Sequence, residues 1–367
     1  MRISKLRLEQ FKNYEHETFE FHERFNCLAG LNGAGKTNVL DALHYLAFTK
    51  SAFLGTDNQN IHHDHPYFAI QGWFEGSEDA FEVVCYQEQR KKKLIKVNKA
   101  EPERISDHIG RIPMVLTTPY DTSLLRDSSE VRRKFMDGTL SQFDHTFLAQ
   151  LLNYQRLLKQ RNSTLKQSDQ MTESSLHTLL DVYDAEMIPL SLAISQKRRD
   201  LVRQFEPFFA ESYRVIGADH EQTIVHYLSQ VLQEDFETQF RANRKKDIIM
   251  QRTLLGCHRD DVDFLLNEHS VKKIGSQGQQ KTFIVALRLA QYDFIRSRRA
   301  DKPILMMDDI FDKLDSQRII RLLDLLHDDE RFGQVILTDA HPDKIKNQFS
   351  DHSQVNFFEI SYGKQVS

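Results

Sequence analysis

The sequence predicts an α/β protein with a mixed sheet around a glycine-rich loop, a small antiparallel sheet and an inserted all-helical arm. Three observations predict this fold class. A strand, a glycine-rich loop and a helix follow one another over residues 25–46, apolar stripes at helical spacing dominate residues 140–194, and short apolar strands return after residue 251. We therefore expect a core made of residues 1–118 and 251–367, with the arm spanning residues 119–250.

Composition places the chain among water-soluble globular proteins. Of its 367 residues, 28% are charged and 40% are apolar, and no apolar run approaches the length of a membrane span. The three cysteines, Cys27, Cys85 and Cys257, form no paired motif, so a reducing cytoplasm is the simplest setting and a zinc site is not expected. Because the net charge is −4, any contact with nucleic acid must come from local basic patches.

The chain begins with a predicted pair of strands around a turn. Apolar side chains alternate with polar ones from Ile3 to Phe11, and Phe19 and Phe21 supply the return strand. Residues 12–14, Lys-Asn-Tyr, form the turn between the two strands.

The glycine-rich loop fits the phosphate-binding pattern G-x-x-x-x-G-K-[ST] at every fixed position. The loop and the residue after it are Gly30, Leu31, Asn32, Gly33, Ala34, Gly35, Lys36, Thr37 and Asn38. Its glycines allow backbone N–H groups to turn inward around a phosphate chain, and the following helix adds the positive end of its dipole. Lys36 can reach the outer phosphates and the Thr37 hydroxyl can hold Mg²⁺. The loop therefore predicts a site for a magnesium–nucleotide complex.

Residues 51–112 alternate between apolar and polar side chains, which predicts a small antiparallel sheet. His62, His63 and His65 cluster before its first strand; a metal site and a solvated loop are the alternatives, and we favour the solvated loop. The basic run of residues 90–93 lies between two strands. A charged hairpin tip and a contact to the DNA backbone explain this run equally well.

The arm is predicted from two apolar stripes. Apolar residues repeat at three and four from Leu140 to Leu158 and again from Leu176 to Ile194, which predicts an antiparallel helix pair joined by a polar loop at residues 161–175. Pro189 lies inside the second stripe, so we expect it to kink or interrupt that helix.

The last part of the chain supplies two carboxylates at the end of an apolar strand. Asp308 and Asp309 follow residues 303–307, and the final strand is expected at residues 334–338. Asp308 is suited to orient Mg²⁺ through water, and Asp309 to polarise an attacking water. With Lys36, these two residues are the predicted catalytic groups.

A third motif resembles the signature loop of ATP-binding-cassette ATPases. It spans residues 276–280, Ser-Gln-Gly-Gln-Gln, at the start of a predicted helix. The resemblance implies that Ser276, Gly278 and Gln279 cap the γ-phosphate of ATP held by the partner chain of a head-to-tail dimer. Residues 312–315 resemble the dimer-contact loop that follows in such proteins. An ordinary polar helix cap is the alternative for Ser276.

With these motifs in order, the chain resembles the RecF family of bacterial recombination and replication-repair ATPases over nearly its whole length. The family segments are matched at residues 11–14, 132–137, 258–261 and 276–280. The resemblance implies an ATP-binding-cassette ATPase head related to SMC heads, with ATP and Mg²⁺ as cofactors. It also implies an ATP-dependent homodimer on double-stranded DNA near gaps or single-stranded DNA, slow DNA-stimulated hydrolysis, and RecO and RecR as partners, with no membrane partner.

The chain departs from the family or cassette pattern at several positions. Lys12 stands where the family usually has arginine; it keeps the positive charge towards the nucleotide but lacks the planar fork. Asp309 stands where cassette ATPases usually have glutamate, which fits slow hydrolysis. The usual glutamine loop is not evident, and residues 119–121 occupy its expected place. His341 is either a switch histidine or a plain surface residue.

Candidate DNA contacts and alternative functions complete the predictions. The basic candidates are residues 90–93 and 132–134, with Arg241, Arg244, Lys245 and Lys246 less certain. An SMC-type head that tethers DNA is the alternative, but such chains need coiled coils longer than residues 140–194 provide. A transporter energy subunit fits the helical arm poorly.

Overall fold

The computed structural model describes residues 1–217, 221–309, 315–340 and 355–366, which group into two compact units. The core unit comprises residues 1–122, 211–220 and 276–367, and the arm unit comprises residues 123–210 and 221–275. The arm unit extends beyond the expected residue 250 because β8 (Thr223–Leu228) pairs with β9 (Asp261–Leu266). This pairing joins residues 251–275 to the helical segment.

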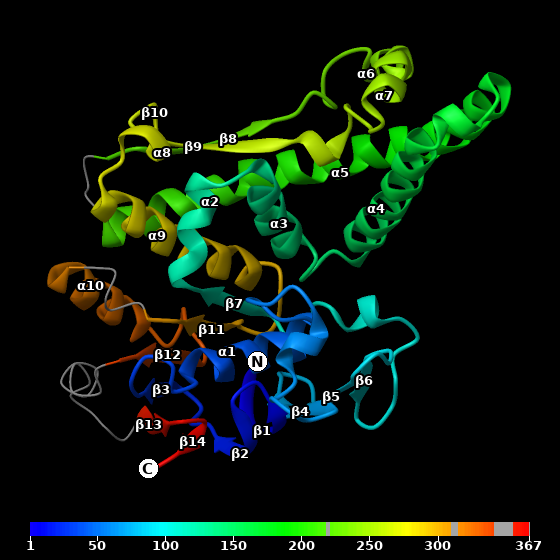
Figure 1. Cartoon of the computed structure of the whole chain (residues 1–367). Helices are drawn as coiled ribbons and strands as arrows, with labels where there is room; N and C mark the ends of the chain where they lie inside the picture. Colours follow the sequence, from blue (N-terminus) through cyan, green and yellow to red (C-terminus); the bar gives the residue numbers. More distant parts are fainter. Residues whose placement is uncertain (218–220, 310–314, 341–354, 367) are drawn as a thin grey trace. The chain divides into compact units, whose positions relative to one another are not determined.

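A six-stranded sheet forms the centre of the core unit, in the order β14-β13-β3-β12-β11-β7 (Figure 1). Its strands are β3 (Phe25–Ala29), β7 (Met114–Thr117), β11 (Ile304–Met307), β12 (Val335–Asp339), β13 (Val355–Ser361) and β14 (Lys364–Gln365). All but β14 run parallel, and β3, β7, β11 and β12 are buried on both faces, as expected of parallel strands. The strand at residues 334–338 is not the last one, because β13 follows it and pairs with β3.

The second sheet of the core unit is antiparallel and has the order β2-β1-β4-β5-β6. Its strands are β1 (Arg2–Phe11), β2 (Tyr14–Glu20), β4 (Tyr67–Glu75), β5 (Ala80–Glu88) and β6 (Leu94–Val97). The first two strands therefore share a sheet with the predicted inserted strands. One face packs on α1 (Lys36–Phe48) through buried side chains such as Leu6, Ile70 and Leu43.

The remaining elements of the core unit are α9 (Gln277–Arg296), α10 (Ser316–Leu326), η1 (Asp57–Asn60), η2 (Ile105–His108) and η3 (Pro119–Thr122). Among the described residues, no helix combines the length and the apolar character needed to cross a membrane.

The arm unit is mostly helical, with a three-stranded sheet in the order β10-β9-β8. Its elements are α2 (Ser123–Arg126), α3 (Ser129–Leu140), α4 (His145–Lys166), η4 (Ser168–Gln170), α5 (Glu173–Ile216), α6 (Phe236–Ala242), α7 (Arg244–Met250), η5 (Cys257–Arg259), β10 (His269–Ser270) and α8 (Val271–Ile274). The predicted helix pair corresponds to α4 and α5, which lie side by side in Figure 1. Residues 211–216 of α5 group with the core unit.

Both apolar stripes differ from their predicted helices. The first crosses a break between α3 and α4, because Asp144 caps α4 by accepting a hydrogen bond from Phe147 N. The second lies on α5, which continues for 44 residues through Pro189 and Pro207 and is not interrupted. A proline inside a helix costs about 3 kcal/mol, and burial of neighbours such as Ile188 offsets this cost.

Candidate nucleotide-binding site

The glycine-rich loop connects β3 to α1 at the carboxyl end of the parallel sheet. Gly30, Gly33 and Gly35 have φ values of 153°, 82° and 120°, which side chains other than glycine rarely adopt. A Cβ on Gly30 would collide with the carbonyl oxygen of Ile360, and one on Gly35 would lie 2.6 Å from Asn13 Nδ2. The loop therefore needs glycine for its conformation and for close packing.

The turn between β1 and β2 fastens this loop in place. Asn13 Nδ2 donates to the carbonyl oxygen of Ala34 over 3.0 Å, and Tyr14 OH donates to that of Gly35 over 3.1 Å. Asn38 Nδ2 in turn donates to Asn13 Oδ1 over 2.7 Å. These side-chain contacts give the 11–14 segment a positioning role beyond that of its lysine.

Lys12 itself is not brought to the nucleotide site. Its ammonium lies 2.5 Å from Asp41 Oδ2, and the two side chains are only 10% and 0% exposed. The ammonium also lies over the rings of Phe11 and Phe53. The buried Asp41 thus pairs with Lys12 and joins the turn to α1, while the contact of Lys12 with the nucleotide stays a prediction.

Lys36 and Thr37 lie where the loop enters α1. Lys36 Nζ donates to the carbonyl oxygens of Gly30 and Leu31, over 2.5 and 3.0 Å. The Thr37 hydroxyl donates to Asp308 and lies 3.0 Å from both of its carboxylate oxygens. The structure thus brings the predicted magnesium residues, Thr37 and Asp308, into contact although they lie 271 positions apart.

Asp308 and Asp309 are held by Thr338, which the sequence did not point to. Thr338 Oγ1 donates to Asp308 Oδ1 over 2.7 Å and accepts from Asp309 N over 2.9 Å. Burial raises the pKa of Asp308 above its usual value. Asp309 has a φ of 50°, and within the described part of the chain its buried Oδ1 has no hydrogen-bond partner. Such strain and an unsatisfied oxygen are typical of functional carboxylates.

These segments enclose a cavity of about 230 Å³. It is lined by Asn32, Gly33, Gly35, Lys36, Thr37, Asn38, Pro119, Tyr120, Asp308 and Asp309. Inward-facing loop glycines, an ammonium group, a hydroxyl and carboxylates form a donor set that fits a phosphate chain with a divalent cation. Gly30, Leu31 and Ala34 are loop residues outside the lining, and Pro119 and Tyr120 join it from η3.

Ser276 and its neighbours lie outside this cavity. Ser276 caps α9: its Oγ accepts from Gln279 N over 3.1 Å, and its own N donates to Gln279 Oε1 over 2.8 Å. The side chain of Ser276 is exposed, and Gly278 lies in the first turn of α9. Residues 312–314 of the expected dimer-contact loop and His341 lie outside the described residues.

Several basic residues predicted to contact DNA are already paired within their own unit. Lys93 Nζ lies 2.9 Å from Asp57 Oδ2 and above the ring of Tyr45. Arg132 binds both oxygens of Asp261, over 2.6 and 3.0 Å. Because their charges are neutralised where they are largely buried, these two residues are less suited to contact DNA than the exposed members of the set.

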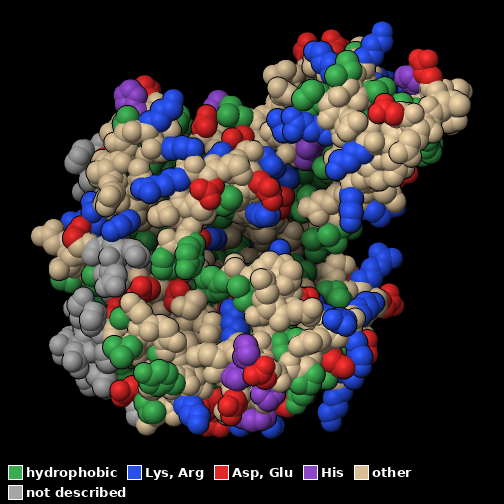
Figure 2. Space-filling view, viewed as in Figure 1, with side chains coloured by type: hydrophobic (Ala, Val, Ile, Leu, Met, Phe, Trp, Pro, Cys, Tyr) green, Lys and Arg blue, Asp and Glu red, His purple; other side chains and the backbone are tan. Residues whose placement is uncertain are grey.

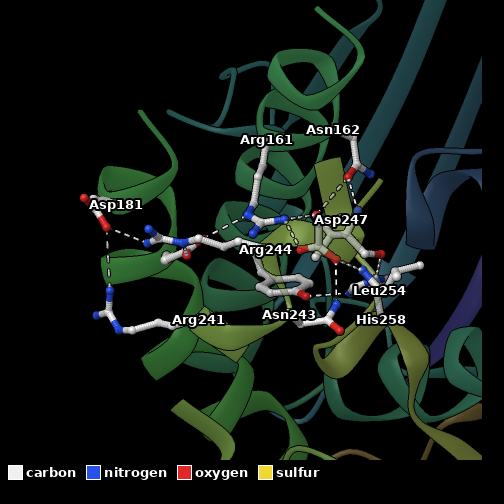
Figure 3. Close-up of polar contacts among 12 residues, drawn as sticks. Arg161, Asn162, Asp181, Arg241, Asn243, Arg244, Asp247, Leu254 and His258 are labelled. Carbon is white, nitrogen blue, oxygen red and sulfur yellow. Dashed lines mark hydrogen bonds and ion pairs between the residues drawn. The ribbon is translucent and has the colours of Figure 1, made fainter. Parts of the chain in front are cut away.

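Arg133 and Arg244 are also engaged. Arg133 donates to the carbonyl oxygen of Asp260. Arg244 donates to Asp184 and Asp181 over 2.6 and 2.5 Å, beside the fully buried Arg161, which binds Asp184 as well (Figure 3). Arg133 therefore joins α3 to the segment before β9, and Arg244 joins α7 to α5. The exposed basic residues left from the predicted set are Arg90, Lys91, Lys92, Lys134, Arg241, Lys245 and Lys246.

The segment of residues 258–261 forms a buried polar cluster in the arm unit. Asp260 is 1% exposed and accepts hydrogen bonds from Ser195, Tyr227, Ser229 and Arg198. Arg198 also binds Asp137 through two bonds of 2.8 Å. This cluster joins the 132–137 segment, which contains the candidate DNA contacts 132–134, to the 258–261 segment, for which the sequence indicates no role.

His62, His63 and His65 lie before β4 in the core unit. His63 is exposed and lies 2.8 Å from Asp64, and the rings of His62 and His65 are 5.2 Å apart. In the part of the chain that the structure describes, no three or more His, Cys, Asp or Glu side chains gather in a way that could hold a metal ion.

Comparison with known proteins gives close matches over nearly the full chain. A family model described as AAA domain matches residues 5–353. The chain is 43% identical over 368 aligned positions to the DNA replication and repair protein RecF of Cytophaga hutchinsonii, covering 99% of this chain and 96% of that protein. It is 38% identical to the protein of the same name from Flavobacterium johnsoniae, covering 94% of this chain and 95% of that protein.

Solved structures match the fold. The recombination mediator protein RecF with ATPrS, from the RecFOR pathway, has a TM-score of 0.87 at 23% identity and covers 100% of this chain and 98% of that one. An Smc head bound to the C-winged helix domain of ScpA has a TM-score of 0.57 at 13% identity, covering 100% of this chain and 96% of that one. These likenesses confirm the predicted α/β head fold.

Proposed function

This chain belongs to the RecF family, and from that premise we propose that it is a DNA-binding ATPase of recombinational repair and replication. The observation that carries the proposal is the contact of Thr37 with Asp308 beside Lys36, at one end of the parallel sheet. Residues far apart in the sequence meet there with the chemistry that a magnesium–ATP complex needs.

Each residue of the site has a separate task in the proposal. Lys36 exchanges its two loop carbonyl partners for the outer phosphates and neutralises part of their charge. Thr37 and Asp308 hold Mg²⁺, which supplies further charge neutralisation when bound. Asp309 accepts a hydrogen bond from the attacking water and orients that water towards the terminal phosphate.

The backbone conformation of Asp309 explains the direction of its carboxylate. Its left-handed conformation is fixed by the hydrogen bond from its N–H to Thr338 Oγ1, so β12 sets the direction of the carboxylate. An aspartate reaches less far than a glutamate from the same backbone, so we expect slow hydrolysis, suited to timing release and not to rapid turnover.

The proposal includes a dimer in which each copy completes the site of the other. The capping box of Ser276 and Gln279 presents an exposed serine at the start of a 20-residue helix. A hydroxyl, a glycine and a helix start can together receive an anion, so Ser276, Gly278 and Gln279 are suited to cap the γ-phosphate in a second copy.

DNA is the proposed macromolecular partner. Arg90, Lys91 and Lys92 lie on the exposed β5–β6 connection, and Figure 2 shows Lys and Arg side chains projecting in that region. Lys134, Lys245 and Lys246 are exposed on the arm unit. We propose that ATP closes the dimer on double-stranded DNA next to gaps or single strands, with RecO and RecR as partners in recombinase loading.

Two variants of the site test the proposal. Lys36→Ala should abolish binding of ATP, whereas Asp309→Asn should bind ATP normally, lose hydrolysis and accumulate as a dimer on gapped DNA. Equilibrium binding and analytical ultracentrifugation with saturating ATP measure both effects. An Asp309→Asn protein that hydrolyses ATP at the wild-type rate, or remains monomeric, contradicts the assignment of Asp309.

A further inference from the structure

Tyr120 is an exposed aromatic residue in the wall of the proposed nucleotide cavity. It lines the cavity with Thr37, Asp308 and Asp309, yet 71% of its surface is exposed. One ring edge meets Phe53, with the ring centres 6.2 Å apart. In the described residues nothing forms a hydrogen bond with its hydroxyl.

The chemistry of the cavity wall shows what this hydroxyl can do. Outside the loop and the start of α1, the described lining consists of Pro119, Tyr120, Asp308 and Asp309. Proline offers no side-chain donor, and ionised carboxylates only accept hydrogen bonds. Tyr120 is thus the only side chain among these four lining residues that can donate a hydrogen bond to a phosphate oxygen.

The position of Tyr120 is fixed by the residue after it. Asp121 receives two hydrogen bonds from Arg288, over 2.9 and 2.5 Å, and one from Thr118 N over 2.9 Å. Arg288 belongs to α9, so this ion pair ties the short helix η3 to a long and largely buried helix. The turn that carries the ring is thus held in place before a ligand arrives, which lowers the entropic cost of using it.

We propose that the Tyr120 hydroxyl donates a hydrogen bond to the terminal phosphate of ATP and so distinguishes ATP from ADP. The inference rests on the proposed function of this cavity and adds the residue that contacts the γ-phosphate. Asp121 and Arg288 act as positioning residues, since they hold the turn that presents the tyrosine.

The test compares ATP and ADP affinity by equilibrium competition with a fluorescent nucleotide in the presence of Mg²⁺. Tyr120→Phe should weaken ATP binding about 10- to 100-fold and leave ADP binding within about two-fold, because a hydrogen bond to a charged acceptor is lost only with ATP. Tyr86→Phe, on the outer face of the antiparallel sheet, is the matched control and should change neither affinity.

Other outcomes overturn the inference in distinguishable ways. If Tyr120→Phe binds ATP and ADP with wild-type affinity, the hydroxyl has no role in binding. If the affinities for ATP and ADP fall equally, the hydroxyl does not contact the terminal phosphate selectively. If the wild-type protein binds neither nucleotide, or if Lys36→Ala binds ATP and ADP with unchanged affinity, the proposed function of the cavity is contradicted instead.

The positioning role of Arg288 is tested separately, by nucleotide affinity in two backgrounds. Arg288→Met should lower ATP affinity more than ADP affinity in the wild type but have little further effect in the Tyr120→Phe background. An equal loss in both backgrounds would show that Arg288 acts independently of the tyrosine.

Discussion

Replacing Asp260 by alanine tests whether the 258–261 segment is architectural. The carboxylate is buried and accepts hydrogen bonds of 2.6, 2.6, 2.7 and 3.1 Å, from Tyr227, Ser229, Ser195 and Arg198. Each bond contributes about 1 kcal/mol, and donors left unsatisfied in the interior cost more, although Arg198 keeps Asp137 as a partner. We therefore expect Asp260→Ala to lower the free energy of unfolding of the arm unit by about 3–5 kcal/mol.

Two spectroscopic signals separate the units in this experiment. Far-UV circular dichroism during urea unfolding reports mainly the arm helices, whereas Trp73, the single tryptophan of the chain, reports the core unit. Asp263→Ala, an exposed carboxylate on the strand that follows Asp260, β9, is the control and should change stability by less than about 0.5 kcal/mol. ATP binding at low temperature should persist in both variants. An Asp260→Ala protein of normal stability without ATP turnover would place Asp260 in the catalytic machinery and exclude a purely architectural role.

Two further predictions concern acid and salt. Burial lowers the pKa of His258 from 6.5 to about 4, so the unfolded state binds a proton first and stability falls as the pH drops from 6.5 to 4, by at most about 3 kcal/mol. His258→Gln should remove this part of the slope in urea titrations at several pH values; an unchanged slope contradicts it. Replacing either Arg90, Lys91 and Lys92 or Lys134, Lys245 and Lys246 by glutamine should flatten the dependence of DNA affinity on salt by about one unit or more in log–log slope. If neither set changes the slope, both are only solvated surfaces.

The glycine-rich loop and its surroundings were predictable because their signals are local. β3 coincides with the predicted strand at residues 25–29, and α1 begins at Lys36, directly after the last loop glycine. A fixed pattern of glycine, lysine and threonine needs no knowledge of the rest of the chain. Asp308 and Asp309 were found in the same way, as carboxylates at the end of an apolar strand.

Thr338 and Tyr120, which complete the site, could not be predicted in this way, because the order of the strands in the sheet brings them to it. Thr338 reaches Asp308 since β12 lies beside β11, and Tyr120 reaches the cavity since β7 lies on the other side. Neither adjacency follows from chain order alone.

The ion pairs of two predicted cations could not be foreseen, for one physical reason. Lys12, predicted to bring charge towards the nucleotide, and Arg132, a candidate DNA contact, each meet a buried or partly buried carboxylate, Asp41 or Asp261, that lies elsewhere in the sequence. A basic run indicates charge, but only the fold shows whether a counter-charge covers it. The uninterrupted α5 reflects the same limit, since tertiary packing overrides the local preference of Pro189.

We expect the ATP held by the Gly30–Thr37 loop to be hydrolysed only when Ser276 of a second copy covers it. Mixing Ser276→Arg protein with Lys36→Ala protein tests this claim directly through the steady-state rate of ATP hydrolysis on gapped DNA. Each variant alone should be inactive, while the mixed dimer has one intact loop facing one intact Ser276, so an equal mixture should recover about a quarter of the wild-type rate. No recovery in the mixture, together with Ser276→Arg protein that binds ATP as weakly as Lys36→Ala, would place Ser276 at the site of its own chain and exclude the composite site in a dimer.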